Sequence, residues 1–207
     1  KIMTYLDLLF IPVTVIYFLV VTTLFMYGLN FLYLSYHAWK KRDALESEPP
    51  KNLESFPFVT IQLPIYNELY VAERLIEAAA ALDYPRGRFE IQVLDDSTDE
   101  TVSLVARSVD RIKARGIDIH HLHRAERHGY KAGALADGLQ TAQGEFIAIF
   151  DADFVPNPDF LKKLLPYFDA DEIAFVQARW GYLNGNYSLL TFLQSLSLDA
   201  HFAVEQL

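Results

Sequence analysis

The stretch that decides the fold reads Phe146-Ile147-Ala148-Ile149-Phe150-Asp151-Ala152-Asp153. Its apolar first part predicts a strand that is buried on both faces of a sheet. Asp151 and Asp153 follow this strand, and in open α/β sheets the carboxyl edge is where ligands bind. Two close carboxylates repel each other unless a cation lies between them, and oxygen ligands suit Mg²⁺ or Mn²⁺. An acidic turn without a ligand is the alternative, because Asp favours turns.

Strands and helices alternate on both sides of this stretch. Short apolar runs predict the strands, and apolar residues at helical spacing predict the helices. We expect strands at residues 58–63, 89–94, 117–122, 146–150 and 173–177, and helices at residues 68–82, 99–114, 130–142 and 158–168. Such alternation implies an α/β fold, with a mostly parallel sheet and helices on both of its faces.

The N-terminal part is different in character. Residues 8–36 contain no Asp, Glu, Lys, Arg or His, and this run exceeds the roughly 20 apolar residues that a membrane-spanning helix needs. Aromatic residues and then a basic cluster follow: Phe31, Tyr33, Tyr36, Trp39, Lys40, Lys41 and Arg42. The positive-inside rule predicts an integral membrane protein in which the domain after the basic cluster is cytoplasmic. The alternatives are a buried soluble helix and a signal peptide, which fits badly because the apolar core is too long.

Length and composition narrow the classes of protein. The 207 residues suffice for one domain with an appendage. We place a membrane helix at residues 1–42, a proline-containing linker at 43–57 and the domain at 58–207. The formal net charge of -9 argues against a nucleic-acid partner. The absence of cysteine excludes a disulfide framework and a cysteine-based zinc site.

A second acidic cluster follows the strand at residues 89–94. Asp95 and Asp96 stand at its end, so a parallel sheet brings them to the same edge as Asp151 and Asp153. The segment from Ser97 to Glu100 also matches a capping box, so it has a second interpretation as the start of the next helix.

The first strand ends in Pro64, Tyr66, Asn67 and Glu68. We expect Pro64 to terminate the strand and Tyr66 to lay its ring against a nucleotide base. The alternative is an ordinary turn in which Asn67 caps the following helix.

Lys131 stands at the start of the helix predicted at residues 130–142, between Gly129 and Gly133. A basic side chain there opposes the helix dipole, whereas a phosphate at a helix N-terminus is favourable. The two glycines permit close approach of the backbone. This segment is not a Walker A loop, because no Gly-Lys-Ser/Thr sequence follows a glycine after a four-residue spacer. The alternative is a solvated lysine.

Five motifs occur in an order that resembles a known family. They are Pro-Ile-Tyr-Asn-Glu at 64–68, Leu-Asp-Asp-Ser-Thr-Asp at 94–99, His-Gly-Tyr-Lys-Ala-Gly-Ala-Leu at 128–135, Phe-Asp-Ala-Asp-Phe at 150–154 and Val-Gln-Ala-Arg-Trp at 176–180. Together they resemble the family 2 inverting glycosyltransferases, in particular the processive, cellulose synthase-like branch. Residues 197–202 and 204–206 look most like its mannan and glucomannan synthases.

The resemblance implies a GT-A fold and a nucleotide-sugar donor, GDP-mannose or UDP-glucose, with Mg²⁺ or Mn²⁺. The acceptor would be a polysaccharide or a lipid-linked acceptor. It implies a nucleotide-sugar site made by Pro64, Tyr66, Glu68, Asp95, Asp96, Lys131 and Asp151, with Asp95 or Asp96 on the base and Lys131 on the diphosphate. Asp153 would bind the metal with Asp151. Gln177, Arg179 and Trp180 would line the acceptor side, although Trp180 also suits a core position.

The chain departs from the family pattern after this point. Neither the motif that supplies the family's catalytic base nor its later Gln-x-x-Arg-Trp motif occurs. The catalytic residue therefore stays unknown, and we expect the chain to be an inactive part of a larger enzyme. The rival interpretations are a catalytically silent membrane-anchored subunit that binds a nucleotide sugar or scaffolds a partner, and a non-processive transferase to a lipid phosphate.

Overall fold

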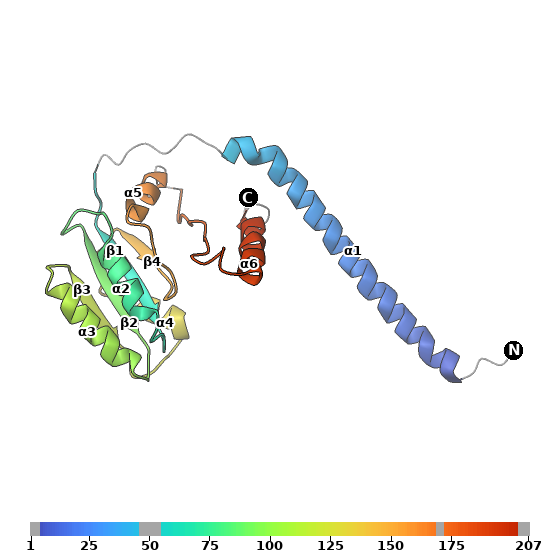
Figure 1. Ribbon diagram of the computed structural model, residues 1–207, viewed down its shortest axis with the longest axis horizontal. Coiled ribbons are helices and arrows are strands. Elements are labelled where there is room, and N and C mark those ends of the chain that lie inside the picture. Colours follow the sequence, from blue (N-terminus) through green and yellow to red (C-terminus); the bar gives the residue numbers. More distant parts are fainter. Residues whose placement is uncertain (1–4, 46–54, 169–171, 203–207) are drawn as a thin grey trace. The chain divides into compact units, whose positions relative to one another are not determined.

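The computed structural model describes residues 5–45, 55–168 and 172–202 (Figure 1). The chain divides into two compact units: Pro50–Val176, and a second unit made of Lys1–Pro49 with Gln177–Leu207. Each unit is described by itself.

The unit Pro50–Val176 is an α/β domain around a four-stranded sheet. Its elements are β1 (Val59–Ile65), α2 (Ala72–Ala80), β2 (Phe89–Asp95), α3 (Thr101–Lys113), β3 (Ile119–His123), α4 (Tyr130–Leu139), β4 (Phe146–Ile149), α5 (Phe160–Leu164) and the 3-10 turn η1 (Leu165–Tyr167). The strand order is β3-β2-β1-β4, and every pair of neighbours is parallel. The predicted α/β class and parallel sheet are confirmed.

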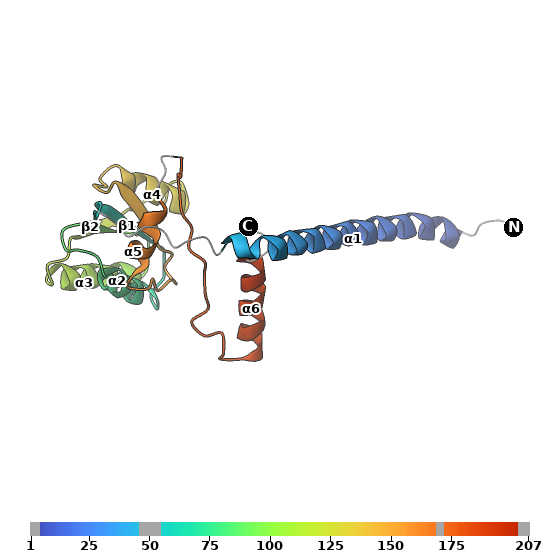
Figure 2. The ribbon, with the colours of Figure 1, turned by 90° about the horizontal axis from the view of Figure 1, so that it is seen from above.

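One face of the sheet is apolar. Alternate residues of β1 and β2, such as Ile61 and Ile91, are fully buried against α2 and α3, which supply Leu75, Ile76 and Ile112 to the same core. The views from the front and from above show α2 and α3 on this face and α4 on the other (Figures 1 and 2). Helices therefore cover both faces, as predicted.

The opposite face of the sheet is polar although it is buried. Thr60 donates to the Glu90 carboxylate at 2.6 Å, and Gln62 donates to Gln92 at 3.0 Å. These side chains lie at 1% exposure or less, where an unpaired polar group would cost about 1–3 kcal/mol. Helix α4 approaches this layer closely at Gly138, where a Cβ would lie 2.6 Å from Gln62 Nε2.

The prediction that the strand at residues 146–150 is buried on both faces is wrong. β4 lies at the edge of the sheet with β1 as its neighbour, and Ile149 is 48% exposed. The predicted strand at 173–177 is also wrong, because these residues have no regular structure and Phe175 is 78% exposed. An apolar run indicates that a segment is buried or paired with another strand, but it does not identify the neighbouring segment that covers it or pairs with it.

Pro64 does not end β1 as predicted. The strand continues to Ile65, and Pro64 is in register with Leu94 of β2. Residue N–H groups alternate between neighbours along a strand, and that of Val59 points to β2, so the nitrogen of Pro64 faces the β4 side. Pairing with β4 ends before this point, at Gln62. A residue without an N–H is therefore tolerated there.

The predicted helices are longer than the observed ones. α2 begins at Ala72 and not at residue 68, because Asn67 takes a left-handed conformation with φ of 54° and residues 69–71 form a turn before the helix. α3 and α4 end at Lys113 and Leu139. The helix predicted at 158–168 ends at Leu164 and passes into η1, where Pro166 cannot donate an α-helical hydrogen bond.

The other unit contains α1 (Tyr5–Leu45) and α6 (Leu189–Ala200). α1 is one continuous helix, and its segment Phe10–Lys40 is long and apolar enough to cross a membrane. This segment includes nearly all of the predicted run at 8–36. α6 begins with a capping box in which Ser188 accepts from the Thr191 N–H.

Candidate active site

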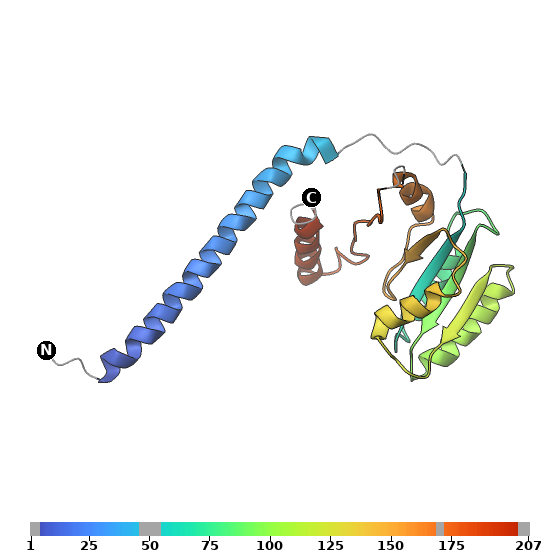
Figure 3. The same cartoon turned by 180° about the vertical axis from the view of Figure 1, so that it is seen from behind.

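A cavity of about 310 Å³ opens at the carboxyl edge of the sheet, beside the ends of β1 and β2 and the first turn of α4. Figure 3 shows this part of the domain from behind. Every donor-side residue predicted from the sequence except Asp95 lines it: Pro64, Tyr66, Glu68, Asp96, Lys131, Asp151 and Asp153. Parallel pairing of β1 with both β2 and β4 brings the three loops together.

The two carboxylates that follow β4 differ in their partners. Asp151 forms an ion pair with Lys131. The Asp153 side chain is exposed and has no ion pair or hydrogen bond among the described residues, while its backbone oxygen accepts from Arg74 at 3.4 Å. A free carboxylate two residues from a paired one, both lining a cavity, fits the oxygen ligands that Mg²⁺ and Mn²⁺ prefer.

The loop before α4 holds Lys131 at the cavity. Gly129 precedes the helix with φ of 66°, and Lys131 is the second helical residue. Gly133 packs so closely on the loop that a Cβ would lie 1.9 Å from the His128 carbonyl oxygen. Only glycine allows this close approach of α4 to the loop.

Asp96 is held by an arginine that the sequence reasoning did not identify. Arg124 Nε donates to Asp96 Oδ1 at 2.7 Å and Arg124 Nη2 to Oδ2 at 2.6 Å, while Nη1 donates to Asp137 at 2.9 Å. The hydrogen bonds that Arg124 donates to Asp96 raise the pKa of Arg124 above its ordinary value. This bidentate pair fixes the orientation of the Asp96 carboxylate at the cavity wall.

A second arginine, also missed, covers the ring that was expected to meet the base. The Arg127 guanidinium carbon lies 3.5 Å from the centre of the Tyr66 ring and 5.2 Å from that of Tyr130. Its Nε is buried and has no hydrogen-bond partner in the part of the chain that the structure describes, and it lies 3.7 Å from Asp96 Oδ2. Arg124 and Arg127 lie in the loop before α4. They stand neither at the end of a predicted strand nor at the start of a predicted helix, so the sequence analysis gave them no role. The feature that could have indicated one is the cluster of basic residues ahead of Lys131.

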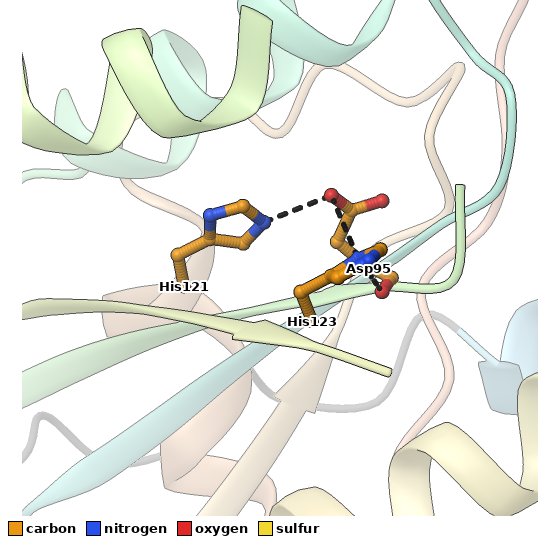
Figure 4. Close-up of side chains that lie close together, drawn as sticks. All are labelled: Asp95, His121 and His123. Carbon is orange, nitrogen blue, oxygen red and sulfur yellow. Dashed lines mark hydrogen bonds and ion pairs between the residues drawn. The ribbon is translucent and has the colours of Figure 1, made fainter. Parts of the chain in front are cut away.

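Asp95 lies outside the cavity lining. Its Oδ1 accepts from the Ser97 N–H at 2.9 Å, and its Oδ2 lies 2.8 Å from His121 Nε2 (Figure 4). Burial acts to raise the pKa of Asp95, but the hydrogen bonds from His121 and Ser97 outweigh it and hold the pKa below its ordinary value. Of the two adjacent aspartates, the structure brings Asp96 to the cavity.

The capping interpretations of this edge are wrong. The residue before α3 is Glu100, which makes no capping hydrogen bond with its side chain. Ser97 instead accepts from the Asn67 N–H at 2.9 Å, and Asn67 accepts from the Thr98 N–H at 2.9 Å. These hydrogen bonds join the loops after β1 and β2 and thereby support one side of the cavity.

The acceptor-side residues Gln177, Arg179 and Trp180 belong to the other unit. Within it, Arg179 forms a 2.6 Å ion pair with Asp199, and the Trp180 ring lies 5.9 Å from that of Phe202. Their role toward the cavity therefore stays a prediction.

Comparison with known families identifies the class to which this fold belongs. The model of glycosyl transferase family 2 matches residues 60–196. The chain belongs to this family, as the order of the five motifs indicated.

Named relatives and a solved structure agree with that assignment. The chain is 44% identical over 179 residues to glucomannan 4-beta-mannosyltransferase 2 of Arabidopsis thaliana, covering 81% of this chain and 34% of the relative. It is 42% identical over 166 residues to glucomannan 4-beta-mannosyltransferase 1 of Oryza sativa subsp. japonica, covering 78% and 32%. The chain thus spans about a third of the length of these curated relatives.

The solved structure is a mannosyltransferase of Pyrobaculum calidifontis, PcManGT, in complex with GDP-Man and Mn²⁺. It has 29% sequence identity to this chain and a TM-score of 0.59, and the match covers 70% of this chain and 42% of that one. The predicted GT-A fold and the resemblance to glucomannan synthases are confirmed.

Proposed function

We propose that the protein is a membrane-bound hexosyltransferase. It transfers a sugar, with inversion, from a nucleotide donor to a growing β-linked polysaccharide, and residues 58–207 contribute the donor-binding part. The observation that carries the proposal is the cavity that gathers Tyr66, Asp96, Lys131, Asp151 and Asp153 at one edge of a parallel sheet. Of the two expected donors, GDP-mannose is favoured, because the named relatives are mannosyltransferases and the solved one holds GDP-Man.

Different residues of the cavity would contact different parts of the donor. Pro64, Tyr66, Glu68 and Asp96 would contact base and ribose, while Lys131 and Asp151 would meet the diphosphate. Arg127 covers the Tyr66 ring, so a base that stacks on this face of Tyr66 would have to take the place of the guanidinium. The displaced arginine retains Asp96, 3.7 Å from its Nε, as a partner.

The residues present fit a divalent cation. Asp153, with Asp151, would hold Mg²⁺ or Mn²⁺, and such an ion neutralises the charge of a leaving diphosphate when bound. Lys131 on α4 would supply a positive charge to the negatively charged diphosphate. In the structure it pairs with Asp151, and it would exchange this partner for phosphate oxygens when the diphosphate binds.

The acceptor side rests on fewer observations. We assign Gln177, Arg179 and Trp180 to the acceptor and leave the catalytic base unassigned. In an inverting transfer the acceptor hydroxyl attacks the anomeric carbon opposite the diphosphate and gives its proton to a general base.

The experiment that tests the function has two stages. First, the detergent-solubilised chain is titrated with GDP-mannose and UDP-glucose in the presence of Mn²⁺, and we expect GDP-mannose to bind more tightly. Second, the longer protein is assayed in membranes for incorporation of labelled mannose into polymer. Absence of binding for both donors contradicts the assignment of the cavity, whereas tight binding without any transfer supports the silent binding subunit.

Helix α1 is the basis for the membrane assignment. We propose that Phe10–Lys40 crosses the bilayer with the basic end, and hence the transferase domain, on the cytoplasmic side. The support is the length of the apolar segment, the exposure of its side chains and the basic residues after it.

Replacement of Val20 by Arg tests this assignment. Val20 lies near the middle of the segment, and an arginine at the bilayer centre costs about 2.5–3.5 kcal/mol on insertion scales. We expect the variant to be extracted from membranes by alkaline carbonate more readily than wild type, while Val20→Leu behaves as wild type. A wild-type chain that is monomeric without detergent contradicts the membrane span.

A further inference from the structure

We propose that Asp95, His121 and His123 form a second metal site, which is separate from the donor cavity and selective for a transition metal such as Zn²⁺. No part of the proposed donor chemistry uses these side chains. They face one another at the carboxyl ends of β2 and β3 (Figure 4), and none of the three lines the cavity that holds Asp151 and Asp153.

The sheet itself places the ligands. Asp95 is in register with His123 on the neighbouring strand, and Val93 is in register with His121. Because side chains alternate along a strand, His121 and His123 project from the same face. Two paired strands hold the positions of these three residues more rigidly than a loop would.

The separations between the ligand atoms suit one ion. Asp95 Oδ2 lies 2.8 Å from His121 Nε2 and 3.6 Å from His123 Nδ1, and the ligand atoms of all three residues lie within 4.8 Å of one another. Ligands of a tetrahedral zinc with bonds of about 2.0–2.2 Å are about 3.3–3.5 Å apart. The two observed distances from Asp95 Oδ2, 2.8 and 3.6 Å, lie on either side of this range. Small rotations of the side chains would therefore bring the three ligand atoms to the spacing of a zinc site.

The surroundings also suit a bound ion. Asp95 is fully buried and its other oxygen accepts from the Ser97 N–H, which orients the carboxylate. The side chains of His121 and His123 are 18% and 39% exposed, so an ion can enter from solvent and keep a water as its fourth ligand. A bound metal would take the place of the proton between Asp95 Oδ2 and His121 Nε2, and it would displace the hydrogen bond between His123 Nδ1 and the Asp95 backbone oxygen, which lie 3.0 Å apart.

The ligand set distinguishes this site from the donor site. Two imidazole nitrogens and one carboxylate oxygen favour Zn²⁺, Co²⁺ or Ni²⁺, whereas a site of oxygens alone favours Mg²⁺ or Mn²⁺. A second group with His120, Asp118 and Glu90 lies on the other strand face, but Glu90 already accepts from Thr60 and from the Gln143 N–H. We therefore place the ion at Asp95 and use His120 as the control.

The test is a titration of the detergent-solubilised chain with Zn²⁺ and, separately, with Co²⁺ in excess Mg²⁺. We expect one Zn²⁺ per chain and a Co²⁺ visible absorption band of tetrahedral intensity. His121→Ala and His123→Ala should each weaken Zn²⁺ binding by about 100-fold or more, because even partners outside the metal's own ligands contribute about 10–100-fold. His120→Ala should bind as wild type.

Two controls separate this inference from the proposed function. Asp153→Asn should keep Zn²⁺ binding even if it loses Mn²⁺-dependent nucleotide binding, and the two histidine variants should keep a wild-type far-UV circular dichroism spectrum. No Zn²⁺ binding by wild type, or equal binding by wild type, His121→Ala and His123→Ala, overturns the proposal. Loss of Zn²⁺ binding in His120→Ala alone moves the ion to the other strand face and also overturns it.

Discussion

Replacement of Asp153 by Asn is expected to weaken Mn²⁺-dependent binding of GDP by about 100-fold or more while the fold stays intact. Asp153 lines the proposed donor cavity and its carboxylate has no partner among the described residues, so its charge is available to a cation. An amide is a weaker ligand for a hard ion than a carboxylate, and metal sites lose about 10–100-fold even when an outer partner is changed. The exposed position predicts an unchanged melting temperature.

Calorimetric titration with GDP, with and without Mn²⁺, measures the effect. Asp110→Asn is the matched control, because this carboxylate is exposed on α3 and does not line the cavity. We expect the control to bind as wild type. Equal affinity of Asp153→Asn and wild type in Mn²⁺ would show that the metal is held elsewhere.

Replacement of Lys131 by Ala is expected to weaken binding of the donor diphosphate by tenfold or more. A hydrogen bond to a charged group contributes about 1.5–3 kcal/mol, and the Lys131 side chain lines the cavity. A loss of this size corresponds to a decrease in affinity of about tenfold or more.

Lys162→Ala and Lys163→Ala are the controls. Both lysines also form ion pairs, at 2.8 Å with Asp83 and at 2.6 Å with Asp159, but neither lines the cavity. Exposed pairs of this kind contribute about 0–1 kcal/mol to stability, and we expect less than a twofold change in donor affinity. Small, equal effects at all three lysines would mean that Lys131 is an ordinary solvated residue.

The sequence was sufficient to predict most of the polar residues that line this cavity. Asp96 and Asp151 were expected at one edge because parallel strands end together, and Lys131 was expected to meet a phosphate because it stands at a helix start. All three line one cavity. Arg127 and Arg124 were not expected. Their contacts with Tyr66 and Asp96 join loops that are far apart in the chain, and no local pattern encodes such a pairing.

Local sequence rules also failed where two loops compete for the same side chain. Ser97 and Asn67 both match helix caps, yet in the structure each bonds to the loop of the other. A capping residue satisfies a backbone group within its own segment, whereas here the neighbouring loop provides the partner. Sequence spacing cannot distinguish these outcomes, because only the paired strands bring the loops together.

What the sequence by itself determined was the kind of most elements and the sheet edge at which the carboxylates lie. The apolar period distinguished strand from helix for every expected element except the strand at residues 173–177, and the uncharged run at residues 8–36 indicated a long apolar helix. The carboxylates that follow the strands were placed at one edge of the sheet. The tertiary structure decided which strand lies at the edge of the sheet, that Asp96 and not Asp95 lines the cavity, and that Asp95 meets His121 and His123. The physical reason is that periodicity acts through a residue's own backbone, whereas strand order and register depend on packing between segments distant in sequence.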